Sequence, residues 1–90
     1  MAYRLEFKPA ALRDLKRLPK PANRRLAKSI EALAEEPRPR GVKKLQGKAE
    51  RVFYRLRVGD YRVIYQVHDD VVLVLIVRVA GRKEIYRLQL

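Results

Sequence analysis

The stretch from residue 51 to residue 66 most constrains the fold, because two runs of alternating side chains flank the dipeptide Gly59-Asp60. An alternation with a period of two is typical of a β-strand with one buried face. Glycine adopts a positive φ readily and aspartate can hydrogen-bond to its own backbone, so the dipeptide favours a tight turn. We therefore predict a β-hairpin of residues 51–58 and 61–68. Its expected apolar face carries Val52, Tyr54, Leu56 and Val58 on the first strand and Tyr61, Val63, Tyr65 and Val67 on the second.

The opposite face of this hairpin carries guanidinium groups. Arg51, Arg55 and Arg57 alternate with the apolar residues of the first strand, and Arg62 does so on the second. Guanidinium groups stay charged and bind phosphate oxygens in pairs. Several arginines held side by side on a sheet therefore indicate a phosphate-binding surface.

The charge of the whole chain also indicates an anionic partner. Its 90 residues have a net charge of +12, and basic residues outnumber acidic ones nine to two from Arg38 to Arg62, a tally that includes Lys48 and Glu50. Such a charge on a compact domain favours a polyanionic partner, which means nucleic acid, an anionic membrane surface or an acidic protein. A basic surplus that served solubility alone would not need to be concentrated in one part of the sequence.

Composition excludes several kinds of site. The chain has no cysteine and a single histidine, His68, so it can form neither a disulfide framework nor a thiolate or multi-histidine metal site. It contains no run of about 18 apolar residues, and its first residues do not resemble a secretory signal. We expect one cytoplasmic domain spanning residues 1–90, with no cofactor, metal or membrane association.

The remaining segments predict two helices before the hairpin and strands after it, with residues 37–41 as a loop and 42–47 as a connector. The expected elements are a strand at 2–8, helices at 9–18 and 21–36, the hairpin strands, an apolar strand at 71–79 and a short strand at 83–88. The order β-α-α-β-β-β-β predicts a small α+β domain. We expect an N-terminal strand, an αα-hairpin and an antiparallel sheet of about four strands, with the helices packed on one face.

Each predicted helix has one apolar stripe and one polar face. In the first helix the stripe repeats every third residue, and Asp14 is expected to face outward with Arg13, Lys16 and Arg17. In the second helix the apolar residues are spaced by four and three. The stripes consist of Leu12, Leu15 and Leu18 in the first helix and Leu26, Ile30 and Leu33 in the second.

The candidate site consists of basic residues and one tyrosine. The sequence shows no Ser-His-Asp set, no glycine-rich phosphate loop and no cluster of metal ligands. Neighbouring strands can bring the remaining polar groups together around a phosphodiester. The candidates are Arg55, Arg57 and Arg62 from the hairpin, Lys43 and Lys44 from the connector, and Arg82, Lys83 and Tyr86 from the C-terminal segment.

This set of side chains is sufficient for RNA cleavage. The ribose 2′-hydroxyl attacks the adjacent phosphorus if its proton is removed and the added negative charge is neutralised. Arginine neutralises that charge well but is a poor base, because its pKa lies above 12. Tyr86, Lys44 and Lys83 are the groups available for proton transfer. A nuclease without a catalytic histidine depends mainly on positioning and charge, so we expect low activity on free RNA.

Three segments resemble the RelE/ParE superfamily of bacterial and archaeal toxins, and together they cover nearly the whole chain. The opening Tyr3-Arg4-Leu5-Glu6-Phe7 and the helix after it fit the family pattern. In the middle of the chain, two motifs match the family pattern: Leu45-Gln46-Gly47 and the run Gly59-Asp60-Tyr61-Arg62-Val63-Ile64-Tyr65. The ending Gly81-Arg82-Lys83-Glu84-Ile85-Tyr86 matches the closing Arg-x-x-x-Tyr element of that family.

The resemblance implies the toxin of a type II toxin–antitoxin pair that enters the ribosomal A site and cuts mRNA without a metal. On the matching positions, it implies that Arg62 contacts the scissile phosphate, that Arg82 stabilises the transition state and that Tyr86 orients the nucleophile or transfers a proton. Arg55 holds a basic position with an acid–base or charge role. Arg57, Lys43, Lys44 and Lys83 are expected to contact RNA.

Two positions depart from the family pattern. Phe53 stands where many members have a second lysine, and Ala80-Gly81 stands where some have a histidine. Two alternatives therefore stay open. One is a ParE-like inhibitor of DNA gyrase, which shares the fold without cutting RNA, and the other is a non-catalytic RNA-binding module.

The resemblance also implies macromolecular partners. A RelE-like toxin acts on mRNA in the A site of the 70S ribosome and is neutralised by an acidic, RelB-like antitoxin, whose charge would complement +12. We expect an antitoxin segment to cover the basic face or displace the last strand. Higher-order toxin–antitoxin complexes would bind operator DNA through the antitoxin.

Overall fold

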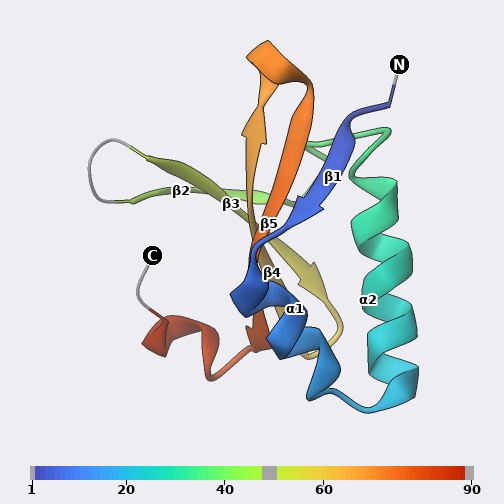
Figure 1. Cartoon of the computed structure of the whole chain (residues 1–90). Helices are drawn as coiled ribbons and strands as arrows, with labels where there is room; N and C mark the ends of the chain where they lie inside the picture. Colours follow the sequence, from blue (N-terminus) through green and yellow to red (C-terminus); the bar gives the residue numbers. More distant parts are fainter. Residues whose placement is uncertain (1, 48–50, 89–90) are drawn as a thin grey trace.

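The computed structural model describes residues 2–47 and 51–88, so Lys48 and Glu50 of the charge tally lie outside the described residues. The described residues form two α-helices and one five-stranded sheet (Figure 1). Their bounds are β1 Arg4–Phe7, α1 Pro9–Lys16, α2 Lys20–Ala32, β2 Lys43–Gln46, β3 Val52–Val58, β4 Tyr61–His68 and β5 Leu73–Gly81. Two 3₁₀ turns, η2 Asp69–Val71 and η3 Ile85–Arg87, follow β4 and β5. None of the described helices is long and apolar enough to cross a membrane.

The strand order across the sheet is β1-β5-β4-β3-β2. The pairs β2–β3, β3–β4 and β4–β5 are antiparallel. The edge strand β1 runs parallel to its neighbour β5. Buried residues of both helices pack against one face of this sheet. The predicted α+β class, with a four-stranded antiparallel sheet covered by helices on one face, is confirmed, and the predicted N-terminal strand joins that sheet as β1, its fifth strand.

Three predictions about strands are wrong in detail. The connector at 42–47 contains β2, which pairs with the first half of β3, and residues 83–88 form a turn and η3 in place of a strand. The C-terminal segment leaves the sheet because the backbone N–H of Glu84 bonds to the carbonyl of Gly81 and Ile85 is buried against the sheet face. The strand predicted from residue 71 begins at Leu73, because Val71 lies in η2 and is 52% exposed.

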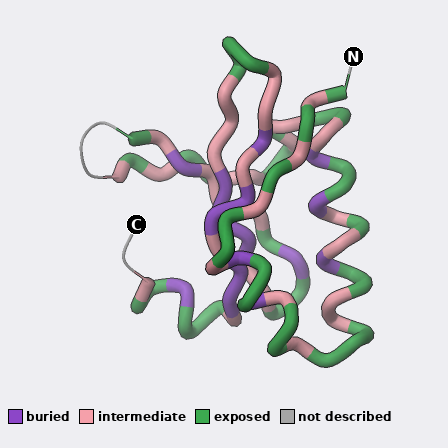
Figure 2. Tube along the Cα trace, viewed as in Figure 1, coloured by how far each residue is buried: buried purple, intermediate pink, exposed green. Residues whose placement is uncertain are grey.

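The β3–β4 hairpin forms as predicted, with Gly59 at a φ of +58° in its turn. Tyr54 pairs with Tyr65 across the two strands, and their rings stack with centroids 5.6 Å apart. The predicted apolar face packs against the helices, and Leu26, Ile30 and Leu33 of the predicted stripe are almost completely buried (Figure 2).

The other face of the hairpin is only partly polar. Phe53 and Ile64 lie among the alternating arginines, but both are buried in a second apolar cluster with Val77, Ala80 and Ile85. The alternation places Phe53 and Ile64 on the same face as the arginines, and the structure buries both of them there, so this face is partly apolar. The sheet buries apolar side chains on both faces, and the C-terminal segment covers the second cluster.

The first helix differs from its predicted pattern. It ends at Lys16, Leu12 is 47% exposed, and Asp14, predicted to face outward, is buried. β1 ends opposite Ile76, and α1 packs beside the following part of β5. There the Asp14 carboxylate accepts hydrogen bonds from the backbone N–H of Val79 (2.9 Å) and from Nε (2.9 Å) and Nη2 (3.1 Å) of Arg78. A carboxylate thus satisfies an edge N–H that no strand reaches.

The loop after α2 is fixed to the sheet by polar contacts. Arg38 forms a two-point ion pair with Asp69 (2.7 and 3.2 Å), and the Tyr3 hydroxyl donates to the same carboxylate at 2.6 Å. The buried Tyr65 hydroxyl donates to the carbonyl of Pro37 at 2.7 Å. These contacts connect the N-terminal segment and the loop after α2 to β4 and η2. Hydrogen bonds from Arg38 and then from Tyr3 lower the pKa of Asp69 from 3.8 to about 2.

Replacing Asp14 with Asn tests the contact at the edge of β5. Asp14→Asn keeps an acceptor for Val79 but presents an amide to the Arg78 guanidinium. We expect the free energy of unfolding to fall by about 2 kcal/mol, in the range for hydrogen bonds to charged groups. Urea denaturation measures the change. Glu6→Gln is the matched control, because its ion pair with Arg4 is solvent-exposed, and it should change stability by less than about 1 kcal/mol. Equal effects of the two variants would contradict the role of Asp14.

The depressed pKa of Asp69 predicts a dependence of stability on acid pH. Because its folded-state pKa lies below the unfolded value of 3.8, the contribution is fully present above about pH 4 and is lost as the pH falls through about 2. NMR titration of the Asp69 carboxyl group should give a midpoint near 2. Arg38→Gln should raise that midpoint more than Tyr3→Phe does, because Arg38 has the larger effect. A midpoint near 3.8 in the wild-type protein would exclude the ion pair in solution.

Candidate functional site

A basic cleft of about 330 Å³ lies on the sheet face that the helices do not cover. Its lining contains five of the eight predicted site residues together with Gly41. The lining residues are Gly41, Lys43, Arg55, Arg57, Arg62 and Tyr86. Strand register brings the basic side chains together, because Lys43 is paired with Arg55 across β2 and β3, and Arg57 with Arg62 across β3 and β4. Directly paired residues share a face of the sheet.

Arg55 and Tyr86 meet in this cleft although they are 31 positions apart in the chain. The Arg55 guanidinium carbon lies 5.6 Å from the centroid of the Tyr86 ring, and its Nη1 approaches the phenol oxygen at 3.4 Å. Tyr86 is 75% exposed, while the preceding Ile85 is buried in the second apolar cluster. Burial of Ile85 therefore positions the phenol at an open rim of the cleft, where it faces a fixed cation.

The Arg62 side chain is fixed by the hairpin turn beside it. Its Nη1 donates to the carbonyl oxygens of Gly59 (3.1 Å) and Tyr61 (2.9 Å). These two bonds use the hydrogens of one terminal nitrogen and leave those of Nε and Nη2 for another acceptor. The guanidinium is thus oriented before any ligand binds, which reduces the entropy lost on binding an anion.

The charge in the cleft is unbalanced. Arg57 and Arg62 are directly opposite on neighbouring strands, a placement in which like charges destabilise a sheet. Lys43 and Arg55 form the next basic pair, and none of the lining residues is acidic. Among the described residues, the acidic side chains that form ion pairs are those of Glu6, Asp14 and Asp69, and each pairs with an arginine outside the cleft. The cleft is therefore complementary to a polyanion with closely spaced charges, such as a sugar–phosphate backbone.

Three predicted site residues lie outside the cleft lining. Lys44 is paired with Tyr54, whose ring packs on the helix-covered side, so it faces away from Lys43. Arg82 and Lys83 are exposed in the turn after β5. The backbone N–H of Arg82 donates to the carbonyl of Asp60 at 2.8 Å, which holds this turn beside the hairpin turn. Arg82 is therefore near the end of the cleft that holds Arg62, while its side chain is exposed to solvent.

Sequence reasoning missed Gly41 as part of the cleft. Gly41 has a φ of +90°, a left-handed conformation that favours glycine, and it lies two residues before Lys43. Its place after two prolines in Pro37-Arg38-Pro39-Arg40 was a signal for a loop and not for a site. Among the described residues, no group of three or more His, Cys, Asp or Glu side chains is placed to hold a metal ion.

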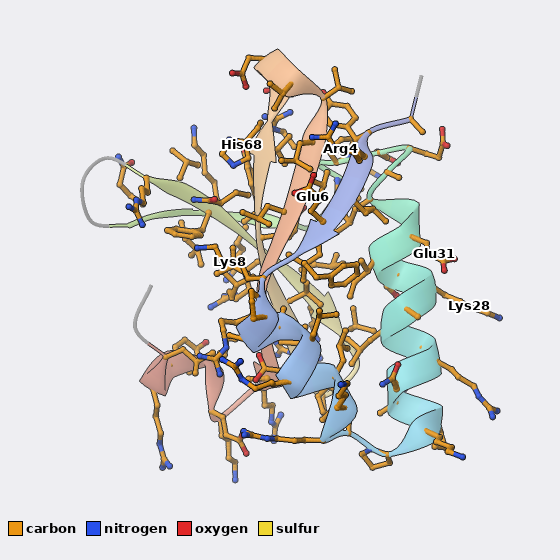
Figure 3. All side chains as sticks on the ribbon, in the orientation of Figure 1. Arg4, Glu6, Lys8, Lys28, Glu31 and His68 are labelled. Carbon is orange, nitrogen blue, oxygen red and sulfur yellow. The ribbon has the colours of Figure 1, made fainter. Side chains whose placement is uncertain are left out.

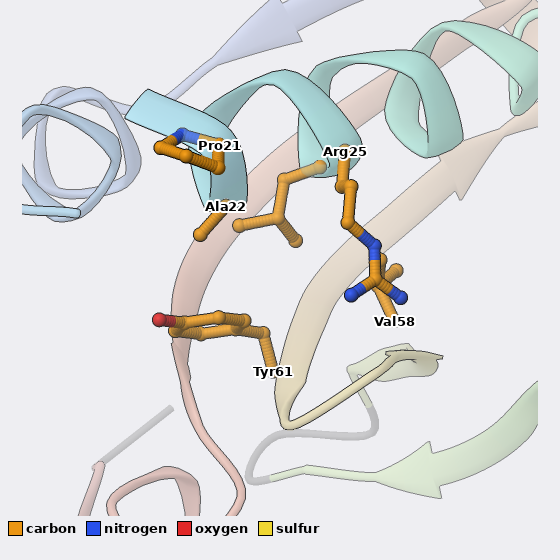
Figure 4. A pocket seen from close by; sticks show the side chains of 6 residues that line it. Pro21, Ala22, Arg25, Val58 and Tyr61 are labelled. Carbon is orange, nitrogen blue, oxygen red and sulfur yellow. The ribbon is translucent and has the colours of Figure 1, made fainter. Parts of the chain in front are cut away.

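A second depression, of about 150 Å³, lies between the start of α2 and the hairpin turn (Figure 4). Its walls are mostly apolar and include Pro21, Ala22, Val58 and Tyr61. Arg25 extends along its edge, and a Cβ added at Gly59 would lie 3.0 Å from the Arg25 guanidinium. None of the predicted site residues lines this depression, so the basic cleft remains the candidate functional site.

Comparisons with known proteins agree with this arrangement. A family model described as the ParE toxin of the type II toxin–antitoxin system parDE matches residues 5–86. The mRNA interferase toxin RelE of Escherichia coli K12 is 34% identical over 96% of this chain and 92% of its own length. Among solved structures, RelE in the archaeal RelE–RelB complex of Pyrococcus horikoshii superposes with a TM-score of 0.79 at 36% identity, covering 91% of this chain and 97% of that one. The isolated E. coli RelE toxin superposes with a TM-score of 0.75 at 31% identity, covering 96% and 93%.

The fold and the family match define a toxin of type II toxin–antitoxin systems. Within that class, the chain belongs to the RelE/ParE toxin family and is RelE-like, since relatives named RelE match it over almost its full length. The resemblance drawn from the sequence motifs is confirmed. The roles of individual residues in the cleft remain predictions.

Replacing Arg57 with Gln should separate stability from anion binding. Arg57→Gln removes the repulsion with Arg62, so we expect the free energy of unfolding at low salt to stay level or rise by about 0.5 kcal/mol. Inorganic phosphate should stabilise the wild-type protein more than the variant, as measured by urea denaturation with and without phosphate. Arg51→Gln removes the same charge outside the cleft and should respond to phosphate like the wild type. An equal phosphate effect in all three proteins would contradict anion binding at Arg57.

Proposed function

We propose that this chain is a ribosome-dependent, metal-independent endoribonuclease that cleaves mRNA in the ribosomal A site and so inhibits translation. The observation that carries the proposal is the basic cleft, which four cationic side chains line together with Tyr86 and which has no carboxylate in its lining. The mRNA interferase activity named for the RelE relatives supports it. Because translating ribosomes are its substrate, we place its action in the cytoplasm.

The reaction needs charge neutralisation and two proton transfers. The ribose 2′-oxygen forms a bond to the adjacent phosphorus and loses its proton, while the bond from phosphorus to the 5′-oxygen breaks and that oxygen gains a proton. The products are a 2′,3′-cyclic phosphate and a 5′-hydroxyl. Arg62 is assigned to the scissile phosphate, because Nε and Nη2 of its fixed guanidinium remain available to two phosphate oxygens. Arg57 and Lys43 add affinity for the neighbouring phosphates.

Tyr86 is assigned to the proton transfers or to orienting the attacking hydroxyl. Arg55 faces its phenol oxygen at 3.4 Å, where a fixed cation offsets negative charge that develops during the reaction. Arg82 is assigned to stabilising the transition state from the end of the cleft beside the hairpin turn, and its exposed side chain must turn inward to do so. Lys44 and Lys83, outside the lining, are assigned to RNA contacts without chemistry.

Dependence on the ribosome fits the exposure of Tyr86. Its phenol is 75% exposed at the rim of the cleft, so the side chain assigned to the attacking 2′-hydroxyl does not enclose a flexible RNA strand. Fixing the 2′-oxygen in line for attack is worth several kcal/mol of barrier, and the A site would supply it by holding the codon. Free RNA should therefore be a poor substrate.

We also propose that a RelB-like acidic antitoxin neutralises this chain. The net charge of +12 and the complexes of RelE relatives with RelB support this partner. Tyr86 is held in place by a short C-terminal segment anchored through Ile85, so an antitoxin segment that covers the cleft or displaces η3 would remove the site. Binding to operator DNA would come through the antitoxin.

Primer extension on an mRNA in a purified translation system tests the proposed activity. We expect new ends inside A-site codons only when ribosomes are present. Arg62→Gln, Arg82→Ala and Tyr86→Phe should each reduce cleavage by about 100-fold, because each removes a group that acts on the transition state. Arg51→Gln, which removes an exposed arginine outside the cleft, should cleave like the wild type. Adding a purified RelB-like antitoxin should abolish cleavage.

The ParE description of the matching family model supports a second candidate function, inhibition of DNA gyrase without RNA cleavage. Intact mRNA together with growth arrest and inhibited DNA supercoiling would favour that function. Cleavage that is equally fast in Arg62→Gln and Tyr86→Phe would show that the chemistry does not take place in this cleft.

A further inference from the structure

The loop between α2 and β2 connects the two faces of the sheet. Pro39 lines a depression together with Ser29 and Ala32 of α2, on the helix-covered face, whereas Gly41 lines the basic cleft on the opposite face. Gly41 has a φ of +90°, which lets the backbone turn sharply between these two positions. Figure 1 shows this segment running from the end of α2 to β2. We call residues 37–41 the crossover loop.

On the helix-covered side, the crossover loop is fixed by the carboxylate of Asp69. Arg38 pairs with this carboxylate at two points (2.7 and 3.2 Å), and its Nε donates to the Tyr54 hydroxyl at 2.9 Å. The Tyr3 hydroxyl donates to the same carboxylate at 2.6 Å. The guanidinium of Arg38 is therefore held between β3 and the turn that follows β4.

The turn that carries Asp69 has a strained backbone. It joins β4 to β5 at the end of the sheet that His68 marks in Figure 3. Val72, which follows η2, has a φ of +53°, a conformation that is disfavoured for a β-branched residue. Its backbone N–H donates to the carbonyl of Asp69 (3.3 Å), and its carbonyl accepts from the N–H of Arg4 in β1 (2.9 Å). Such strain persists where surrounding contacts fix the backbone, so the turn presents Asp69 in a defined position.

The crossover loop leads directly to Lys43 of the cleft. β2 has four residues, and Lys43, the first of them, lies opposite Arg55. The far end of β2 is anchored by Leu45, which packs against the second apolar cluster, and by a hydrogen bond of 2.7 Å from the Gly47 N–H to the Arg51 carbonyl. The near end continues from the crossover loop, so a shift of that loop moves Lys43.

We propose that Asp69 and Arg38 are positioning residues for the cleft, because their ion pair holds the crossover loop where Lys43 can contact a bound phosphate. This inference rests on the phosphate binding proposed for the cleft and extends it to the opposite face of the sheet. Asp69 is not among the lining residues and acts through Arg38 and the loop. A contact that served stability alone would leave the phosphate affinity of the folded protein unchanged.

Long-range electrostatics predicts the opposite effect when Asp69 is neutralised. In Asp69→Asn the net charge rises by one, from +12 to +13, and a more positive protein attracts an anion more strongly. Loss of the ion pair releases Arg38 and the crossover loop, and the misplaced Lys43 then weakens binding. The sign of the change in affinity therefore separates positioning from charge.

An NMR titration with a dinucleotide tests the proposal. The probe has a 5′-phosphate and 2′-O-methyl riboses, so it cannot be cleaved, and the backbone amide shifts of Gly41 and Arg55 report its dissociation constant in the cleft. We expect Lys43→Gln to weaken binding about threefold, as for the loss of one exposed ion contact. Asp69→Asn should weaken it by about twofold or more. The matched control is Asp70→Asn, which removes the same charge from an exposed residue that forms no ion pair within residues 2–47 and 51–88, and it should bind slightly more tightly.

Two further variants show whether the effect passes through the crossover loop. In a Lys43→Gln background, Asp69→Asn should no longer weaken binding, because the side chain that it positions is absent. Arg38→Lys keeps the charge but cannot hold the carboxylate at two points, so it should weaken binding as Asp69→Asn does. Urea denaturation of each variant identifies a temperature at which all of them are folded, which keeps lost stability out of the comparison.

The outcomes separate this inference from the proposed function. Tighter or unchanged binding by Asp69→Asn, together with weaker binding by Lys43→Gln, would overturn the positioning role and leave the proposed function intact. Equal weakening by Asp69→Asn in the presence and absence of Lys43 would also overturn it. If Lys43→Gln and Arg57→Gln both bind the dinucleotide like the wild type, the cleft is not a phosphate site, and the proposed function fails together with this inference.

Discussion

The antiparallel register between β3 and β4 sets both the core and the cleft. It places Tyr54 opposite Tyr65, whose stacked rings pack under the helices, and in the same ladder it places Arg57 opposite Arg62 on the other face. A slip of one residue would turn every side chain of a strand to the wrong face, directing arginines into the core and tyrosines into the cleft. Apolar packing against the helices thus determines where the guanidinium groups lie, although those groups add repulsion and not stability.

The unbalanced charge depends on how the acidic residues are used. Asp14 and Asp69 form ion pairs that hold α1 and the loop after α2 against the sheet. These two carboxylates thus stabilise the fold, and neither of them lines the basic cleft. Ile85 adds the last part of the site, because its burial beside Phe53 anchors the turn that carries Tyr86 over Arg55.

Much of the site was predictable because it lies in regular strands. Alternation along β3 and β4 indicated that Arg55, Arg57 and Arg62 share a face, and the register confirms it. The pairing of Lys43 with Arg55 was not predictable, because the six residues of the connector at 42–47 give too short a pattern to indicate a strand. Tyr86 was predicted to lie on a strand at 83–88, whereas the structure has it in the 3₁₀ turn η3. A 3₁₀ turn gives the phenol a direction that strand alternation does not provide.

By itself, the sequence determined the α+β class, the hairpin about Gly59-Asp60 and the family, because periodicity and turn chemistry are local properties and motifs are read directly. Only the tertiary structure decided which polar residues are buried and which basic ones converge. Asp14 looks solvent-exposed in a helical pattern, yet it is buried, because β1 ends before β5 does and leaves an N–H that only this carboxylate reaches. Likewise, Phe53 interrupts a row of arginines in the sequence but supports the C-terminal segment in the fold. Contacts between segments far apart in the chain leave no local pattern, and these contacts assemble the cleft.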